Sequence, residues 1–399
     1  MCGLSGDTAI GMGSELLLII VVVVALAFDF TNGFHDTANA MATSIATGAL
    51  KPRVAVAISA MGNFAGAFVS IKVAATIATG IVDTKAITLT LVFAALIGAI
   101  AWNLITWALS LPSSSSHALI GGVVGATLAG IGGSAVKVHG LVSKVLLPAL
   151  FSPVIAGLVA IAGTYAAYKL VARLRRGQAR RGYRLGQIGS ASLVSLAHGT
   201  NDAQKTMGVI TLALIAHGDL NSHHFSVPVW VKLSCALAIA LGTYIGGWRI
   251  INTMGNRLVD IESPQGFAAE SAGASVILAS SYFGYPLSTT HVVGGAVVGS
   301  GLGKRLASVH WGKAGQMAGG WVVTIPGAAL MGAGAWEGAN LFGSGDAGPI
   351  VIGVIAIALA AALYVFAQRT PVRAGDLDRT HVSPEEEARP AGAPAAATA

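Results

Sequence analysis

Charged residues are scarce in this sequence, because Asp, Glu, Lys and Arg together make up only 10% of its 399 residues. An ordinary soluble domain contains about 25% of these residues. Hydrophobic residues make up 54% of the chain, so too few polar faces remain to cover a large soluble helical core. The composition therefore disfavours soluble proteins and favours an integral membrane protein.

Cysteine is also rare, since only Cys2 and Cys235 are present and the second lies inside an apolar segment. No disulfide framework is therefore predicted. The alternation of apolar and polar residues that is typical of membrane barrels is missing, so the spans should be helices. The first apolar stretch runs directly into a polar motif at residues 31–39, so we expect a retained span and not a cleaved signal peptide.

Long apolar segments are what the sequence has in abundance. A helix needs about 20 residues to cross the hydrocarbon core, and about twelve segments approach or exceed this length. We expect an all-α integral membrane protein with segments at residues 14–31, 36–50, 54–82, 87–111, 113–135, 144–172, 188–216, 227–251, 265–283, 287–303, 311–336 and 348–368.

The net charge of +7 first suggests a nucleic-acid partner, but the basic residues gather between apolar segments. Such clusters are typical of cytoplasmic loops and disfavour nucleic-acid binding. We therefore predict a first membrane repeat (1–172), a basic cytoplasmic linker (173–187) and a second membrane repeat (188–368). The tail at 369–399 is rich in proline, glutamate and alanine and is expected to be disordered. The basic cluster comprises Arg173, Arg175, Arg176, Arg180, Arg181 and Arg184.

The two halves of the chain repeat each other. Residues 112–125 (PSSSSHALIGGVVG) correspond to residues 286–299 (PLSTTHVVGGAVVG), 174 positions further on. Residues 35–41 (HDTANAM) correspond to 201–207 (NDAQKTM), 166 positions further on. Repeated halves with broken helices are typical of secondary transporters, whose sites lie at the repeat interface. We expect the halves to be inverted if each crosses the membrane an odd number of times, with hairpin or half-helix elements at the site.

Two acidic residues occupy corresponding places in the repeats, Asp36 and Asp202. A charged residue inside a span costs about 2.5–3.5 kcal/mol, so it usually marks function. Carboxylate and amide oxygens together suit a hard cation such as Na⁺ or Mg²⁺, and the carboxylate alone suits a proton. The alternative is a helix cap. The predicted cation-coupling group is Asp36, Thr37, Asn39, Asn201, Asp202 and His35, with Asp36 and Asp202 as metal ligands.

Each half also contains a run of hydroxyl residues between a proline and a glycine-rich helix. Cap hydroxyls and free backbone N–H groups at a helix start form an anion site. A tetrahedral oxyanion such as phosphate or sulfate fits, because hydroxyls donate hydrogen bonds without adding charge. Helix capping and packing between spans are the alternative. The two runs are Ser113, Ser114, Ser115 and Ser116, and Ser288, Thr289 and Thr290.

Several other polar residues adjoin these motifs. Lys205 can contact an anionic substrate or neutralise Asp202, and Gln204, which precedes it, is predicted to bind the substrate as well. Glu270 is a further intramembrane carboxylate without an assigned partner, and Asp29 faces either a cavity or the membrane surface. Three histidines can relay protons or be structural residues, namely His35, His117 and His291.

An enzyme is disfavoured, although Ser, His and Asp are all present. Nucleophilic catalysis needs one serine held by one histidine and one orienting acid. Nothing selects one serine from the run, and a duplicated nucleophile has no mechanistic purpose. The two adjacent residues at 35–36 also lack the spacing of a zinc peptidase.

Residues 32–40 (NGFHDTANA) and 199–208 (GTNDAQKTMG) resemble the paired signatures of the inorganic phosphate transporter (PiT) family. The resemblance covers about residues 15–368. It implies phosphate uptake by cation symport, a duplicated helical fold of about twelve segments, homodimers in the cell membrane and no bound cofactor. His35 resembles the bacterial low-affinity branch, in which protons drive uptake of a neutral metal–phosphate complex, for example with Mg²⁺. Na⁺ coupling remains the alternative.

The resemblance also assigns roles to the motifs. It implies that the elements 113–117 and 288–291 hold phosphate, and that the cation lies near Asp36, Asn39, Asn201 and Asp202. Import of an anion against an inside-negative potential costs about 2.3 kcal/mol per charge per 100 mV, which a cotransported cation offsets. The alternatives are a sulfate permease on the same scaffold, a phosphate-binding sensor or receptor, and a passive channel.

Overall fold

A computed structural model describes residues 7–379, apart from residues 85, 173–175, 222–224, 305–308 and 344. The described part contains helices and no strand. The α-helices are α1 (Asp7–Ala46), α2 (Pro52–Gly66), α3 (Lys72–Gly80), α4 (Leu89–Ala108), α5 (Ser115–Gly130), α6 (Val138–Leu141), α7 (Leu147–Val171), α8 (Arg176–His217), α9 (Val229–Ile245), α10 (Trp248–Asn256), α11 (Ser263–Phe283), α12 (Thr289–Lys304), α13 (Trp311–Asn340) and α14 (Ala347–Ala367). Short helices of other types are η1 (Gly133–Ala135), η2 (Val142–Leu146) and η4 (Ala374–Leu377).

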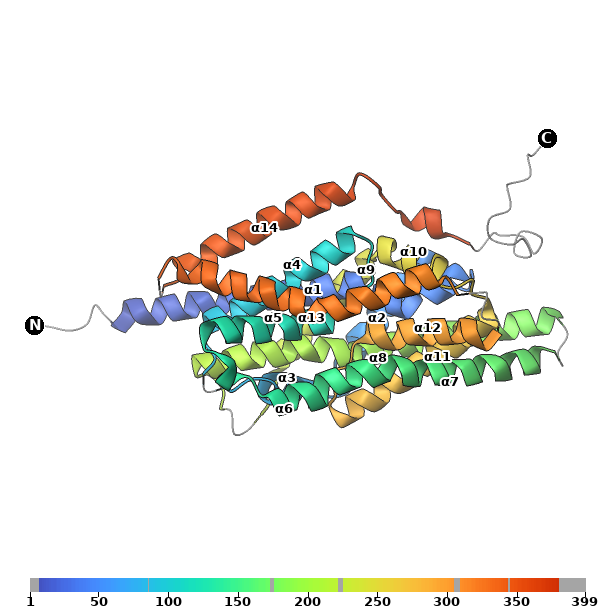
Figure 1. The fold of residues 1–399 in the computed structure, drawn as a ribbon, viewed down its shortest axis with the longest axis horizontal. Helices are drawn as coiled ribbons and strands as arrows, with labels where there is room; N and C mark the ends of the chain where they lie inside the picture. The colour runs from blue at the N-terminus through green and yellow to red at the C-terminus, as the bar shows by residue number, and fades with distance from the viewer. Residues whose placement is uncertain are drawn as a thin grey trace, which may run out of the picture.

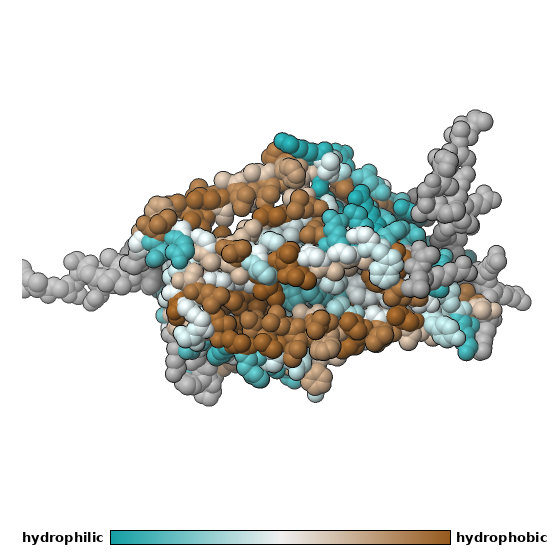
Figure 2. Space-filling model, viewed as in Figure 1, coloured by the Kyte–Doolittle hydropathy of each residue, from teal (hydrophilic) through white to brown (hydrophobic). Residues whose placement is uncertain are grey.

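The long helices run roughly along one axis, with α14 on the outside of the bundle (Figure 1). Apolar residues cover most of the face in Figure 2, and hydrophilic residues gather at the end where α10 and η4 lie. Large apolar side chains on the outer helices are exposed, such as Leu150 at 64%, Val322 at 76% and Ile357 at 71%. A helical bundle that is apolar on its outside is the arrangement expected in a bilayer.

Five of the described helical stretches are long and apolar enough to cross a membrane, or six if the bent pair α9–α10 counts as one span. The two members of that pair meet at 67°. Several of the remaining helices fail this test because polar residues occupy their inner faces, as in α8, or because they are short, as in α5 with 16 residues. The expected number of about twelve segments therefore stays a prediction.

Three predicted boundaries differ from the structure. We expected separate segments at 14–31 and 36–50, but α1 is one helix of 40 residues that runs through the motif. The segment 54–82 divides into α2 and α3. The expected linker is helical from residue 176, because α8 begins there and continues through the second motif. Arg173 and Arg175 lie outside the described residues. The polar motifs are therefore built into continuous helices, where other helices supply partners for some of their side chains, such as Asp36 and Asn39.

Helix contacts in one half have counterparts in the other. Helix α1 packs on α9 as α8 packs on α2, and α5 packs on α13 as α12 packs on α7. The motif helices α1 and α8 are antiparallel, since Thr47, just after α1, donates a hydrogen bond of 2.8 Å to Gln187 near the start of α8. Corresponding helices therefore make corresponding contacts, and the division into two inverted repeats stays a prediction.

Corresponding glycines allow close helix crossings in both halves. A Cβ at Gly33 of α1 would lie 2.3 Å from the carbonyl oxygen of Ile239 in α9. A Cβ at Gly199 of α8 would lie 2.2 Å from the carbonyl oxygen of Asn63 in α2. These glycines are 166 residues apart, and each lies three residues before the acid of its motif. They bring a neighbouring backbone against the motif helix next to the acid.

The start of the expected tail is ordered against the bundle. The Arg249 guanidinium donates to the carbonyl oxygens of Ala108 at 2.9 Å, Ala367 at 2.8 Å and Thr370 at 2.7 Å. Leu377 in η4 is buried. The prediction of disorder from residue 369 is therefore wrong for this first part, and residues 380–399 lie outside the described part of the chain.

Candidate functional site

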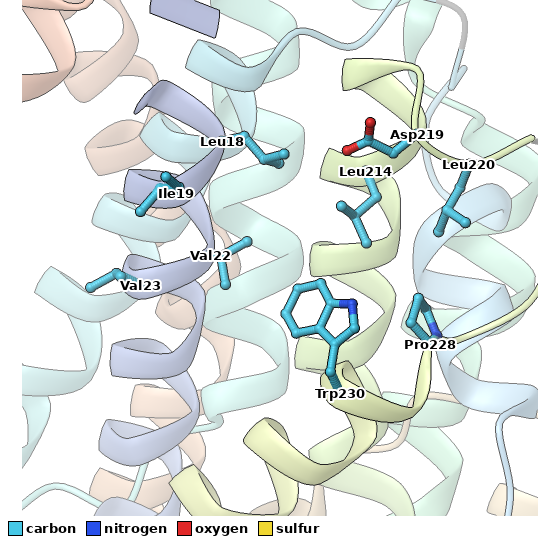
Figure 3. A pocket seen from close by; sticks show the side chains of 9 residues that line it. All are labelled: Leu18, Ile19, Val22, Val23, Leu214, Asp219, Leu220, Pro228 and Trp230. Carbon is cyan, nitrogen blue, oxygen red and sulfur yellow. The ribbon is translucent and has the colours of Figure 1, made fainter. Parts of the chain in front are cut away.

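The open groove shown in Figure 3 is apolar and lies between α1, α8 and α9. It has a volume of about 570 Å³ and is lined by residues such as Leu18, Val22, Leu214 and Trp230. None of the predicted site residues lines it. Those residues lie inside the bundle and are 5% exposed or less. The candidate site is thus a closed polar centre between the two halves.

Asp36 is the point at which both hydroxyl runs meet. The Ser115 hydroxyl donates to Asp36 Oδ1 at 3.2 Å, and the Thr289 hydroxyl donates to Asp36 Oδ2 at 3.5 Å. The Asn39 amide, one turn further along α1, donates to the hydroxyls of Thr289 at 3.3 Å and Thr290 at 3.0 Å. One acidic helix of the first half therefore contacts the hydroxyl elements of both halves.

His35 joins this centre from the same helix. Its Nδ1 lies 2.7 Å from Asp36 Oδ1, and its Nε2 lies 3.3 Å from the Thr106 hydroxyl. The Ser113 hydroxyl donates to that of Thr106 at 2.8 Å. His35 thus connects the carboxylate to the first hydroxyl run through Thr106.

Lys205 forms an ion pair with the second acid of the site. Its Nζ lies 2.7 Å from Asp202 Oδ1, three residues earlier on α8, and both side chains are fully buried. The ammonium also donates to the Ser116 hydroxyl and, at 2.9 Å, to the carbonyl oxygen of Leu287. Of the two roles predicted for Lys205, its contacts in the structure are those of neutralising Asp202.

The two acids approach each other beside a histidine that our sequence reasoning missed. Asp36, Asp202 and His198 each offer a ligand atom, and these atoms all lie within 4.8 Å of one another. His198 corresponds to Asn32 in the first repeat, 166 residues earlier, so comparison of residue types did not reveal it. Its place one turn before Asp202 on a helix was the available signal. The three residues are the kind of donor set that holds a cation.

The hydroxyl runs divide into caps and inward-facing groups. Ser114 accepts a hydrogen bond of 3.1 Å from the His117 backbone N–H, and Ser288 accepts one of 3.2 Å from that of His291. These two serines therefore cap α5 and α12, which is the alternative role that the sequence allowed for the hydroxyl runs. Ser116 donates to the Leu287 carbonyl oxygen at 3.2 Å and so joins the two elements. Two helix starts, each with a partial positive charge, therefore meet beside the acids.

His117 and His291 pack against each other. Their ring centroids are 4.5 Å apart in an edge-to-face arrangement, and the His291 ring stacks on Trp321 at 4.3 Å. His291 Nδ1 also lies 3.3 Å from the carbonyl oxygen of Ala149. The pair joins the first turns of α5 and α12 across the repeat interface.

Other predicted site residues hold neighbouring backbone. Gln204 Oε1 accepts from the backbone N–H groups of Val73 at 2.9 Å and Ala74 at 3.3 Å, and so caps α3. The Thr37 hydroxyl donates to the carbonyl oxygen of Gly33 at 2.6 Å. The Asn201 amide donates to the Ser281 hydroxyl at 2.9 Å. Their predicted contacts with substrate or cation stay predictions.

Glu270 has partners on two motif helices. Its carboxylate accepts hydrogen bonds from the hydroxyls of Thr43 and Ser190, both at 2.5 Å, and from the Gln187 amide at 3.3 Å. Thr43 lies two turns beyond Asp36 on α1. Glu270 thus extends the polar contact between α1, α8 and α11 away from the central acids.

Asp29 is buried inside the bundle and not at a membrane surface. It is 0% exposed, and neither carboxylate oxygen has a hydrogen-bond partner among the described residues. Thr206 and Asn32 lie beside it, and their side-chain polar atoms also lack partners there. The structure therefore does not place Asp29 at the membrane surface, and its expected place beside a cavity stays a prediction.

Comparisons with known proteins found a matching family model, similar sequences and a similar fold. The model of the phosphate transporter family matches residues 32–332. A Mycobacterium bovis protein named "Probable low-affinity inorganic phosphate transporter" is 55% identical over 371 residues, which are 93% of this chain and 88% of that protein. A Bacillus subtilis protein of the same name is 44% identical over 80% of this chain and 96% of its own length. A solved structure described as "The sodium-dependent phosphate transporter" has a TM-score of 0.74 at 24% identity and covers 81% of this chain and 98% of its own.

Proposed function

This chain belongs to the phosphate transporter family and is a multi-pass protein of the cell membrane, and on that premise we propose that it imports inorganic phosphate by symport with a cation. One observation carries the proposal. Asp36 accepts hydrogen bonds from Ser115 of the first hydroxyl run and from Thr289 of the second. A carboxylate that can hold a cation therefore lies beside hydroxyls of both halves that can hold an anion, which supports symport of the two.

Phosphate binds where the starts of α5 and α12 meet. The hydroxyls of Ser113, Ser115, Thr289 and Thr290 and the first backbone N–H groups of both helices are suitable donors for its oxygens. The Ser115 hydroxyl donates to Asp36, and the Asn39 amide donates to the Thr290 hydroxyl. Phosphate and Asp36 can therefore share hydroxyl donors from these runs.

The coupling cation binds between Asp36 and Asp202. Their ligand atoms and that of His198 lie within 4.8 Å of one another and are buried. The cation is a proton or Na⁺, and Mg²⁺ enters together with phosphate if the substrate is a neutral metal–phosphate complex. Positive charge beside phosphate lowers the cost of moving the anion against an inside-negative potential.

Transport follows from movement of one half against the other. The site residues are nearly inaccessible, which fits a closed intermediate between outward and inward openings. The antiparallel packing of α1 on α8 supports inverted repeats. We also infer a homodimer, in which apolar outer helices pack between protomers.

The test is uptake of radiolabelled phosphate by proteoliposomes that contain the purified full chain. Proton and Na⁺ gradients are imposed separately, with and without Mg²⁺, for wild type and Asp36→Asn. Uptake that follows one gradient and is lost in the variant supports the proposal and identifies the ion. Uptake of sulfate without uptake of phosphate indicates a sulfate permease instead. Phosphate binding without uptake indicates a sensor, and uptake that ignores every gradient indicates a channel.

A further inference from the structure

Asn39 and Lys205 occupy corresponding positions, each three residues after the acid of its repeat. The first position carries a neutral amide and the second an ammonium. We propose that the Lys205 ammonium is a tethered cation, which fills one of two cation positions in the coupling site. This inference rests on the proposed function. Its consequence is that each phosphate is accompanied by one mobile cation fewer than the same site would need with a neutral residue at position 205.

The contacts of the ammonium are those of a bound monovalent cation. Three kinds of oxygen surround Lys205 Nζ, namely a carboxylate oxygen of Asp202 at 2.7 Å, the carbonyl oxygen of Leu287 at 2.9 Å and the hydroxyl of Ser116. Carboxylate, carbonyl and hydroxyl oxygens are the ligands that hard cations take in proteins. The oxygens around Nζ are therefore of the kinds that also bind Na⁺.

The same contacts argue against Lys205 as a phosphate ligand. A lysine ammonium has three N–H donors and no acceptor. Three acceptors from three different parts of the chain surround it, at Ser116, Asp202 and Leu287. Since every donor has a partner, a contact with phosphate would first require one of these bonds to break.

Because Lys205 is buried, its ammonium is held beside its partners. Lys205 is 0% exposed, and a charge without a partner is very costly in such a position. Because the spacing of three residues sets Lys205 and Asp202 on one face of α8, the ion pair forms within a single helix. A movement of α8 as a rigid element would therefore carry both charges together.

The corresponding position in the first repeat has no such fixed charge. The Asn39 amide donates to Thr289 and Thr290, and no lysine or arginine forms an ion pair with Asp36 among the residues that the structure describes. Asp202 is therefore paired with a permanently charged ammonium, whereas Asp36 is paired with the imidazole of His35. When that ring is neutral, the charge of Asp36 is left for a mobile cation. The two halves have corresponding helices, but at this position the second half carries the positive charge of Lys205 and the first half carries a neutral amide.

The experiment replaces Lys205 with the residue that its counterpart carries, Lys205→Asn. Purified full-length wild type and variant are compared by equilibrium binding of ²²Na⁺ and by uptake of radiolabelled phosphate with Na⁺ or K⁺ outside. We expect the variant to bind one additional Na⁺ per chain and to lose uptake in Na⁺-free medium. Lys169→Asn is the matched control, since Lys169 is exposed near the end of α7, and should behave as wild type.

Equal Na⁺ binding by wild type and a folded Lys205→Asn protein overturns the inference, as does variant uptake that stays independent of Na⁺. If the variant does not fold, Lys205→Gln offers a carbonyl oxygen at the same place and is judged by the same two results. Failure of wild type to take up phosphate under any gradient overturns the proposed function alone. The Na⁺ count still decides the role of Lys205, because it does not depend on phosphate.

Discussion

The Nε2 atom of His198 lies 3.5 Å from a carboxylate oxygen of Asp202, one turn further along α8. The other ring nitrogen lies 2.9 Å from the side-chain oxygen of Asn63, whose amide nitrogen donates to Thr243 at 2.8 Å. Because Thr243 fixes the direction of the Asn63 amide, the Nδ1 of His198 carries the proton. In the neutral ring, the Nε2 lone pair then faces Asp202 and is available to a cation.

This arrangement predicts that Asn63 positions His198 for cation coupling. Asn63→Leu removes the acceptor of the Nδ1 proton, and we expect the cation concentration for half-maximal phosphate uptake to rise about 10–100-fold. The maximal uptake rate at saturating cation should change much less. Titration of uptake with the coupling ion in proteoliposomes measures both values. An unchanged cation requirement would contradict the positioning role.

A second prediction concerns the buried carboxylate of Glu270. Glu270→Ala leaves the donors of Thr43, Ser190 and Gln187 without this acceptor, at about 1–3 kcal/mol for each unsatisfied group. We expect a marked fall in the unfolding temperature in detergent. The unfolding temperature of Glu270→Gln should fall by less, because glutamine keeps the shape of the side chain and one acceptor oxygen. Equal losses would show that the carboxylate bonds add little stability.

Close packing at Gly33 gives a third prediction. Gly33→Ala would set a Cβ 2.3 Å from the Ile239 carbonyl oxygen, so α1 and α9 must separate. Overpacking of this kind costs about 1–3 kcal/mol. Gly189→Ala is the control, since a Cβ there meets nothing within 4 Å. Alanine in place of this helical glycine should be neutral or stabilising by up to about 1 kcal/mol. Thermal unfolding of both variants tests the contrast.

A fourth prediction concerns pH at the start of α11. Burial alone raises the pKa of the Glu262 carboxyl, but hydrogen bonds from Lys304 and Tyr168 outweigh it and hold the pKa below its usual value. A lowered folded pKa stabilises the fold above the unfolded pKa, and this stabilisation is lost as pH falls through the folded pKa. The loss should therefore occur in mildly to strongly acidic solution.

Glu262→Gln should be less stable than wild type at neutral pH and should lose less stability on acidification. The effect should be small, because the Glu262 side chain is 52% exposed and its pairing with Lys304 is screened by solvent. Unfolding temperatures of the two proteins across the acidic range measure it. Parallel pH profiles would contradict the prediction.

The sequence revealed the central pieces of the candidate site because they are duplicated. Asp36 and Asp202 correspond in register, and the structure brings their carboxylates near each other. Comparison of the two repeats did not identify His198, because the corresponding residue in the first repeat is Asn32 and the two residue types differ. Only three-dimensional contact with Asn63 reveals its direction.

Helix continuity was harder to predict for a physical reason. A polar cluster inside an apolar run suggests a break, because the run alone offers its side chains no partners. In the structure, the partners come from distant segments, as when Ser115 and Thr289 donate to Asp36 in the middle of α1. Gln204 likewise accepts a hydrogen bond from the backbone of α3, more than 120 positions away in the sequence, and no local sequence pattern predicts that contact.

The bonds of Arg249 bear on how this protein can be labelled. The guanidinium ties Ala367 and Thr370 to the end of α4, immediately before the first hydroxyl run. A fluorescent or affinity fusion that replaces the chain from residue 368 would delete Thr370, and the hydrogen bond from Arg249 to its carbonyl oxygen would be lost. A fusion joined after residue 379 keeps every one of these bonds. The choice of junction therefore decides whether a reporter leaves the loop at Ser113 undisturbed.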